Sequence, residues 1–320
     1  MSISLLHPPI DPLSPGRSAR LPDGPILVVD SGLGGLTVAA ALRKRLPAER
    51  LVYVGDTARV PYGSKSPEAI VTACTQVIAA ALDRLKEKGG PAPKHIVIAC
   101  NSASAVALPA LRERFSPTPV TGVIDAGARA AARAAGNRVR ATIGVIATEA
   151  TIRSRAYNTA ILRRRPRAHV LLKPTPLLVP LVEEARAGDD PLVRLALEQY
   201  LHPLMRRAEQ LSRYLDVLVL GCTHYPLLMD PIRRTVGYEV AIVDSASACA
   251  EDVATRLTTA GLLRAQADHA DRKPTIQVFA TDLPHRFGRL ARRFLGEEIA
   301  APELLCVDDG PVSPVPLAIA

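Results

Sequence analysis

The chain has 320 residues, 22% of them charged, and a formal net charge of +9 at pH 7. Its hydrophobic content of 48% and mean hydropathy of +0.13 predict globular domains with sizeable cores and argue against a disordered chain. We find no apolar run near the roughly 18 residues that a membrane helix needs. The sequence therefore predicts a cytoplasmic protein that has no membrane partner.

Residues 1–24 are rich in proline and lack the basic start and long apolar stretch of a signal peptide, so we expect a flexible N-terminal extension. The positive charge is spread along the chain. Aromatic residues make up only 3% of it, too few for a surface that stacks nucleic-acid bases. A nucleic-acid partner is therefore not expected. The densest basic cluster, LRRRPR at 162–167, is interpreted as a solvated face, with a phosphate-binding patch as the alternative.

Short apolar runs that end in small polar residues alternate with helical stretches rich in Ala, Leu and Arg. The runs are ILVVD (26–30), LVYVG (51–55), HIVIA (95–99), VTGVI (120–124), ATIGVIA (141–147), VLVLG (217–221) and AIVD (241–244). Continuous runs of this kind are typical of parallel strands buried on both faces. The predicted fold class is α/β, and ligands in such folds bind beyond the carboxyl ends of the strands.

The number of these units exceeds one compact sheet and indicates two similar domains. IVIACNS and LVLGCTH are candidate counterparts, because each joins an apolar strand to a cysteine, small polar residues and a helix. Their cysteines, Cys100 and Cys222, are 222 − 100 = 122 positions apart, which fits domains of about 100–150 residues. A site between the two domains would carry one thiol on each wall.

The five cysteines form no CxxC pair and no zinc-ligand spacing, so thiols are expected rather than disulfides or metal ligands. Cys100 and Cys222 each follow a strand and precede a helix, whose N-terminus lowers a thiol pKa. A thiolate accepts a proton and a thiol donates one. Burial in the core is the alternative for either cysteine alone, and we expect it for Cys74 and Cys249, which lie in helical patterns. Cys306 has no supporting context.

Two further groups of polar residues are candidates to act with these thiols. Asp30 and Ser31 open the glycine-rich DSGLGG turn, which is neither GxGxxG nor a Walker motif; either residue caps a helix, or Asp30 adjusts the protonation of a thiol. His224 is either structural or a proton partner of Cys222. A hydrolytic Cys222–His224 pair is a further alternative, but it leaves Cys100 without a role.

Several segments together resemble glutamate racemase, within the aspartate/glutamate racemase superfamily. They are DSGLGG (30–35), GDTARVPYG (55–63), ACNSASA (99–105), GVI (122–124), IGVIATEATIRSRAY (143–157), VPLVEE (179–184) and GCTHYPLL (221–228). The resemblance implies two α/β domains with mainly parallel sheets, related by a pseudo-twofold axis, with the active site at their interface. Residues 25–122 together with 251–320 would form the first domain and residues 123–250 the second. A homodimer is also expected.

The resemblance implies interconversion of L- and D-glutamate without a cofactor or metal, which supplies D-glutamate for peptidoglycan. It makes Cys100 the base for the D-enantiomer, assisted by Asp30, and Cys222 the base for the L-enantiomer, assisted by His224 and Glu183. Asp30 and His224 are also expected to contact substrate. The other positions matched to substrate binding are Ser31, Pro61, Tyr62, Gly63, Asn101, Ser102, Thr148, Thr151 and Thr223.

The sequence departs from the family pattern in two places. Ser102 stands where many members have threonine, which keeps the hydroxyl, and Thr175-Pro176 replaces a common Cys-Pro pair. Two alternatives stay open: a racemase of aspartate or hydantoins, and a racemase fold that inhibits DNA gyrase. Some members with N-terminal extensions respond to a cell-wall precursor, and the resemblance does not decide whether this chain does so or binds gyrase.

Overall fold

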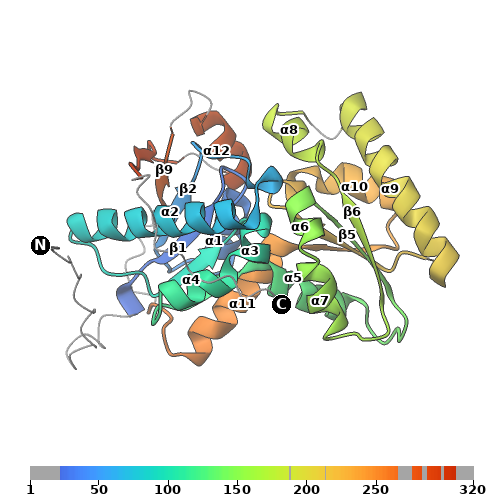
Figure 1. The fold of residues 1–320 in the computed structure, drawn as a ribbon, viewed down its shortest axis with the longest axis horizontal. Coiled ribbons are helices and arrows are strands. Elements are labelled where there is room, and N and C mark those ends of the chain that lie inside the picture. Colours follow the sequence, from blue (N-terminus) through green and yellow to red (C-terminus); the bar gives the residue numbers. More distant parts are fainter. Residues whose placement is uncertain are drawn as a thin grey trace, which may run out of the picture.

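The computed structural model describes residues 22–186, 189–212, 214–265, 276–282, 287–296 and 299–307. Most of the predicted extension at 1–24 and the tail from residue 308 onward lie outside these ranges. Two sheets lie side by side with helices packed around them (Figure 1). Every described strand pair in either sheet is parallel, as the apolar runs predicted.

The first sheet has six strands in the order β10-β9-β2-β1-β3-β4. Their bounds are β1 Ile26–Asp30, β2 Leu51–Gly55, β3 His95–Ile98, β4 Val120–Gly122, β9 Ile276–Ala280 and β10 Glu303–Leu304. Both faces of β1 are buried: Ile26 and Val28 join the core cluster that contains α1 (Leu36–Arg45), and Leu27 and Val29 join the cluster that contains α2 (Pro67–Glu87). This double burial accounts for the unbroken apolar run.

The second sheet has four strands in the order β6-β5-β7-β8, namely β5 Thr142–Ala147, β6 His169–Pro174, β7 Val217–Gly221 and β8 Ala241–Asp244. Helices α5 (Val123–Ala134) and α7 (Ala156–Leu162) contribute to the core cluster on one face. Helices α9 (Pro191–Ser212) and α10 (Met229–Val236) contribute to the cluster on the other. The remaining helices are α3 Asn101–Val106, α4 Leu108–Arg114, α6 Glu149–Arg153, α8 Leu178–Glu183, α11 Ser245–Thr259 and α12 Phe287–Leu295, with 3-10 helices at Tyr62–Ser64 and Tyr225–Leu228.

The sequence prediction was wrong about the extent of one strand. The run VTGVI was expected to be extended to residue 124, but β4 ends at Gly122, and Val123 and Ile124 begin α5. Ser104 Oγ accepts the Val123 N–H at 3.2 Å, which satisfies an amide that has no partner within the helix. The alanine-rich residues that follow then favour a helix.

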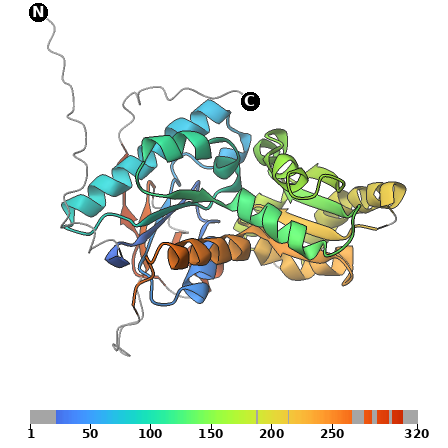
Figure 2. The same ribbon diagram turned by 90° about the horizontal axis from the view of Figure 1, so that it is seen from below.

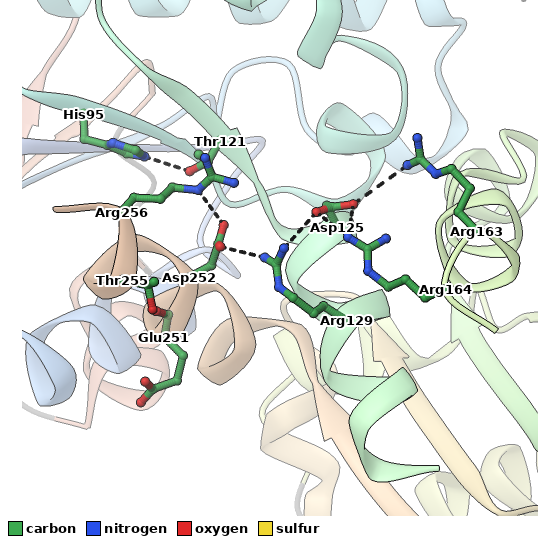
Figure 3. Close-up of polar contacts among 10 residues, drawn as sticks. All are labelled: His95, Thr121, Asp125, Arg129, Arg163, Arg164, Glu251, Asp252, Thr255 and Arg256. Atoms are coloured by element: carbon green, nitrogen blue, oxygen red, sulfur yellow. Dashed lines mark hydrogen bonds and ion pairs between the residues drawn. The ribbon is translucent and has the colours of Figure 1, made fainter. Parts of the chain in front are cut away.

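An ion-pair network holds the helices where the two sheets meet (Figure 3). Asp125 of α5 pairs with Arg129 and with Arg164, and Arg129 also pairs with Asp252 of α11 at 2.6 Å. The basic cluster at 162–167 is therefore only partly a solvated face, because Arg164 is engaged in this network. Helix α11 also packs on α1 and spans the expected domain boundary at 250/251. The division into domains stays a prediction.

Among the residues that the structure describes, none of the helices combines the length and the apolar character required to cross a bilayer.

Candidate active site

Cys100 and Cys222 occupy equivalent places in the two sheets. Cys100 follows β3 as the N-cap residue of α3, and Cys222 follows β7. Both are buried, with 7% and 5% of their surfaces exposed. The charge of Cys222 contributes to the raised pKa of Cys100, so the two thiols lie within electrostatic range of each other. The structure thus brings together, from separate sheets, the two cysteines that the sequence paired.

The Cys100 thiol lies in an environment that favours the protonated form. Burial raises its pKa and the carboxylate of Asp30 raises it further, to about 12. Hydrogen bonds from the Ser31 side chain and the Ala103 backbone act in the opposite direction. The N-terminus of α3 therefore lowers the pKa of Cys100 as expected, but burial and Asp30 raise it by more. At neutral pH Cys100 is a thiol, able to donate a proton.

Asp30 carries a buried carboxyl group at the end of β1, with 3% of the residue exposed. Its Oδ2 accepts the Gly32 N–H at 3.0 Å, whereas Oδ1 has no hydrogen-bond partner among the described residues. Burial raises the pKa of Asp30, while nearby backbone amides and the charge of His224 lower it. A buried oxygen without a partner beside a thiol is costly unless another group bonds to it. Asp30 Oδ1 is therefore able to accept a proton or a hydrogen bond from a ligand.

The DSGLGG turn packs against the loop that carries Cys222. A Cβ at Gly34 would lie 2.4 Å from Thr223 Oγ1 and 2.5 Å from the His224 ring, so any larger residue would displace them. At Gly35 a Cβ would lie 2.5 Å from that of Asp30. The hydroxyl of Thr37, the second residue of α1, donates to the Thr223 carbonyl at 2.9 Å. Gly34 therefore permits close approach between the two sheets at the site, and Gly35 leaves room for Asp30 within the turn.

Cys222, His224 and Glu183 form a chain of polar contacts. His224 Nδ1 lies 3.8 Å from Cys222 Sγ, and its Nε2 lies 2.9 Å from Glu183 Oε1. Burial lowers the pKa of His224, but the hydrogen bonds to Cys222 and Glu183 outweigh that effect and raise it to about 10. The ring is an imidazolium at neutral pH and donates from both nitrogens. Phe294 of α12 packs edge-on against it, with centroids 5.2 Å apart.

A cluster of hydroxyl groups joins the two sheets beside Cys100. Ser102 Oγ, on α3, lies 2.9 Å from Thr148 Oγ1 and 3.4 Å from Thr151 Oγ1, both at the start of α6. The two threonine hydroxyls are 3.1 Å apart. Gly63 packs on Thr148, where a Cβ would come within 3.0 Å of that of Thr148. These four predicted residues therefore meet in one place.

Two predicted substrate-binding side chains are engaged with protein partners instead. The Tyr62 hydroxyl donates to the buried carboxylate of Asp56, and the Tyr62 ring belongs to the core cluster that contains α2. Asn101 accepts a hydrogen bond from the Tyr157 hydroxyl at 2.8 Å and donates to Ser245 Oγ at 3.3 Å. Neither side chain has all of its polar capacity free for a ligand.

Sequence reasoning did not single out several residues that contact the site. Tyr157 lies within the IRSRAY segment of the resemblance, and Ser245 follows the strand-end Asp244. The position of each in the sequence could therefore have identified it as a site residue. Phe294 had none, because an aromatic residue in an amphipathic helix is ordinarily core. Within the described ranges, no three His, Cys, Asp or Glu side chains are grouped as metal ligands.

Known proteins match both the sequence and the fold. Residues 36–253 match the family described as Asp/Glu/Hydantoin racemase. The chain is 40% identical over 302 residues to a glutamate racemase of Chlorobaculum tepidum, covering 88% of this chain and 96% of the relative. It is 43% identical over 281 residues to that of Syntrophus aciditrophicus, covering 87% and 95%. The solved glutamate racemase of Francisella tularensis in complex with D-glutamate superposes with a TM-score of 0.77 at 32% identity, over 90% of this chain and 100% of that one.

Proposed function

Because the chain belongs to the Asp/Glu/hydantoin racemase family, we propose that it interconverts L- and D-glutamate. Glutamate is favoured over aspartate and hydantoins because relatives at about 40% identity over most of the chain are glutamate racemases, and a similar fold holds D-glutamate. The observation that carries the proposal is the pair of buried thiols, one at a strand end of each sheet.

The proposed reaction is proton transfer at Cα with inversion. A thiolate on one face removes the α-proton, and the thiol on the other face donates its proton to the planar carbanion. One C–H bond breaks, one forms, and the two sulfurs exchange protonation states. With L-glutamate, Cys222 is the base and Cys100 the acid, and with D-glutamate the roles reverse. The raised pKa of Cys100 supports the first assignment, since that thiol begins the reaction protonated.

The neighbours of each thiol supply the required difference in protonation. The His224 imidazolium is placed to donate a hydrogen bond to Cys222 Sγ, and Glu183 stabilises the imidazolium. For the reverse reaction Asp30 accepts the proton of Cys100, and the His224 imidazolium gives a proton to Cys222, before the D-enantiomer reacts. The free Oδ1 of Asp30 supports this role, because it can form a bond without breaking another. Asp30 therefore acts through Cys100, and Glu183 acts through His224.

Substrate is held by donors that stabilise negative charge at the α-carboxylate as the carbanion develops. The hydroxyl cluster of Ser102, Thr148 and Thr151, together with Ser31 and Thr223, is proposed for this task. The backbone of Pro61 and Gly63 and the free donor capacity of Asn101 would complete the pocket. Tyr62 is proposed to act by shaping the segment, since its hydroxyl is bonded to Asp56.

The wider role follows from the family. We propose that the enzyme works in the cytoplasm, requires neither cofactor nor metal, and supplies D-glutamate for peptidoglycan synthesis. A homodimer is proposed on the same ground.

A chiral chromatographic assay tests the proposal. Purified protein, treated with a chelator and given no pyridoxal phosphate, is expected to racemise L-glutamate and to leave L-aspartate and hydantoins nearly unchanged. Cys100→Ala and Cys222→Ala should each lower the rate by about 10²–10⁴-fold, the usual contribution of one acid or base. Cys249→Ala is the control, because it removes an equally buried thiol from α11. Preference for another substrate, or activity retained without Cys100, would overturn the assignment.

A further inference from the structure

A groove of about 550 Å³ lies along the second sheet, and none of its lining residues belongs to the candidate active site. The residues come from β6, from the α6–α7 segment and from α9. Four consecutive residues of β6 line it, from Val170 to Lys173, although successive side chains of a strand point to opposite faces. Leu171 packs with the core cluster of α9, and Val170 and Leu172 pack with that of α7. The groove therefore follows the outer edge of β6.

This edge presents backbone groups in position to pair with another strand. β6 is the last strand of its sheet, beside β5 (Figure 1). The amides of His169 and Thr175 donate to carbonyls on the β5 side, both at 2.9 Å. Alternate residues of a parallel strand bond to the same neighbour. Val170 and Leu172 therefore direct their N–H and C=O groups outward, where no other described residue bonds to them.

The position of a proline agrees with this alternation. Pro174 follows Leu172 by two residues and so occupies the next outward place. Proline has no N–H, and within a sheet it is tolerated where no ladder bond is lost. The edge is accordingly open over Val170 and Leu172 and ends at Pro174.

Four cations flank the edge on both faces of the sheet. Arg153 and Arg155 lie on the α6–α7 side and Arg207 on α9, while Lys173 Nζ lies 5.7 Å from the ring centroid of Tyr200, also on α9. No lining residue is acidic, and none of the four forms an ion pair within the part of the chain that the structure describes. The groove thus combines unpaired strand amides with uncompensated positive charge.

We propose that this groove binds an extended acidic peptide segment of a partner protein, added as a further strand beside β6. Such a strand bonds to the outward amides and projects alternate side chains toward the cations on each face. Cations on an edge disfavour pairing with a second copy of the chain, because like charges would meet. A free phosphate would use the cations and leave the amides unpaired. The proposal is independent of racemase activity.

The probe is a fluorescein-labelled peptide Thr-Glu-Glu-Val-Glu-Glu-Thr, which places two glutamates on each face of an added strand. Fluorescence anisotropy is expected to report saturable binding that weakens as salt is raised. The matched control peptide has the same sequence with an N-methyl group on every internal residue, which removes the amide donors along both of its edges and keeps every charge. It should bind about tenfold more weakly or worse. Hydrogen exchange at Val170 and Leu172 should slow when the unmodified peptide is added.

The protein variant Arg153→Glu/Arg207→Glu should weaken peptide binding by about tenfold or more and keep wild-type racemisation. Arg114→Glu is the control, because it reverses an exposed arginine on α4, outside the groove. Equal binding of the N-methylated peptide would overturn the proposal by reducing the site to a charged surface. Tighter binding of tripolyphosphate or a single-stranded oligonucleotide, or a dimer that the double variant dissociates, would also overturn it.

Discussion

The Tyr157 hydroxyl donates a 2.8 Å hydrogen bond to Asn101 Oδ1, which joins α7 of the second sheet to the residue that follows Cys100. Gly127 and Gly221 make room for the tyrosine, since a Cβ at either would come within about 3 Å of its side chain. Gly221 directly precedes Cys222. One buried side chain therefore contacts both segments that carry the thiols.

Tyr157→Phe removes this bond and keeps the ring. A buried Asn101 oxygen left unpaired costs about 1–3 kcal/mol, and the loss should appear mainly in kcat because the two thiols lose their fixed relative position. We expect kcat/KM for L-glutamate to fall about tenfold or more. Tyr238→Phe is the control, since Tyr238 is 81% exposed. Unchanged kinetics for Tyr157→Phe would show that the bond does not position the site.

Gly34→Ala tests the close approach between the glycine turn and the Cys222 loop. The new Cβ would collide with Thr223 and His224, so the loop must move. We expect a loss of about 100-fold in kcat/KM and destabilisation of about 1–3 kcal/mol. Gly288→Ala on α12 is the matched control, because its Cβ meets open space and alanine favours the helix by about 1 kcal/mol. Similar behaviour of the two variants would contradict the role given to Gly34.

His224 predicts a specific dependence of stability on pH. Its pKa is raised from 6.5 to about 10 in the folded protein, so its stabilising contribution is full below pH 6.5 and is lost as the pH rises through about 10. The gap in free energy of unfolding between wild type and His224→Gln should shrink over that window. Urea titrations followed by circular dichroism measure it, since the chain has no tryptophan. Cys74 and Cys249, which lie outside the Cys222–His224–Glu183 contacts, are present in both proteins, so their titration cancels in the difference. A gap that widens with pH would contradict the assignment.

Strands buried on both faces were predictable from the sequence because they are apolar except for a polar residue at one end of some of them. β1, β2, β5 and β7 match the predicted runs closely. β8 was also predicted, although it is a half-buried edge strand, because its run AIVD is apolar up to the final aspartate. β6 was missed because it is a half-buried edge strand that ends in Lys173 and Pro174, residues that weaken a strand pattern. β4 was predicted too long because Val123 and Ile124 suit either a strand or a buried helix face.

At the site, the sequence predicted which residues come together but not what their environments do to them. Cys100 and Cys222 were identifiable from matched strand ends, and Ser102, Thr148 and Thr151 meet as the motifs suggested. The raised pKa of Cys100 was not predictable, because burial and the distance to Asp30 are tertiary properties. The hydrogen bond from Tyr62 to Asp56 was not predictable either, because it too depends on the tertiary structure.

The most direct test of the two-thiol account is early isotope incorporation during racemisation in heavy water. Each thiol exchanges its proton with solvent, and inversion takes a proton on one face and delivers one on the other. Starting from protiated L-glutamate, mass spectrometry of the separated enantiomers at low conversion should find deuterium at Cα of D-glutamate, with the remaining L-glutamate still protiated. The same should hold with the enantiomers exchanged. Deuterium appearing equally in substrate and product, or product that retains the original proton, would mean that a single base serves both faces and would contradict the account.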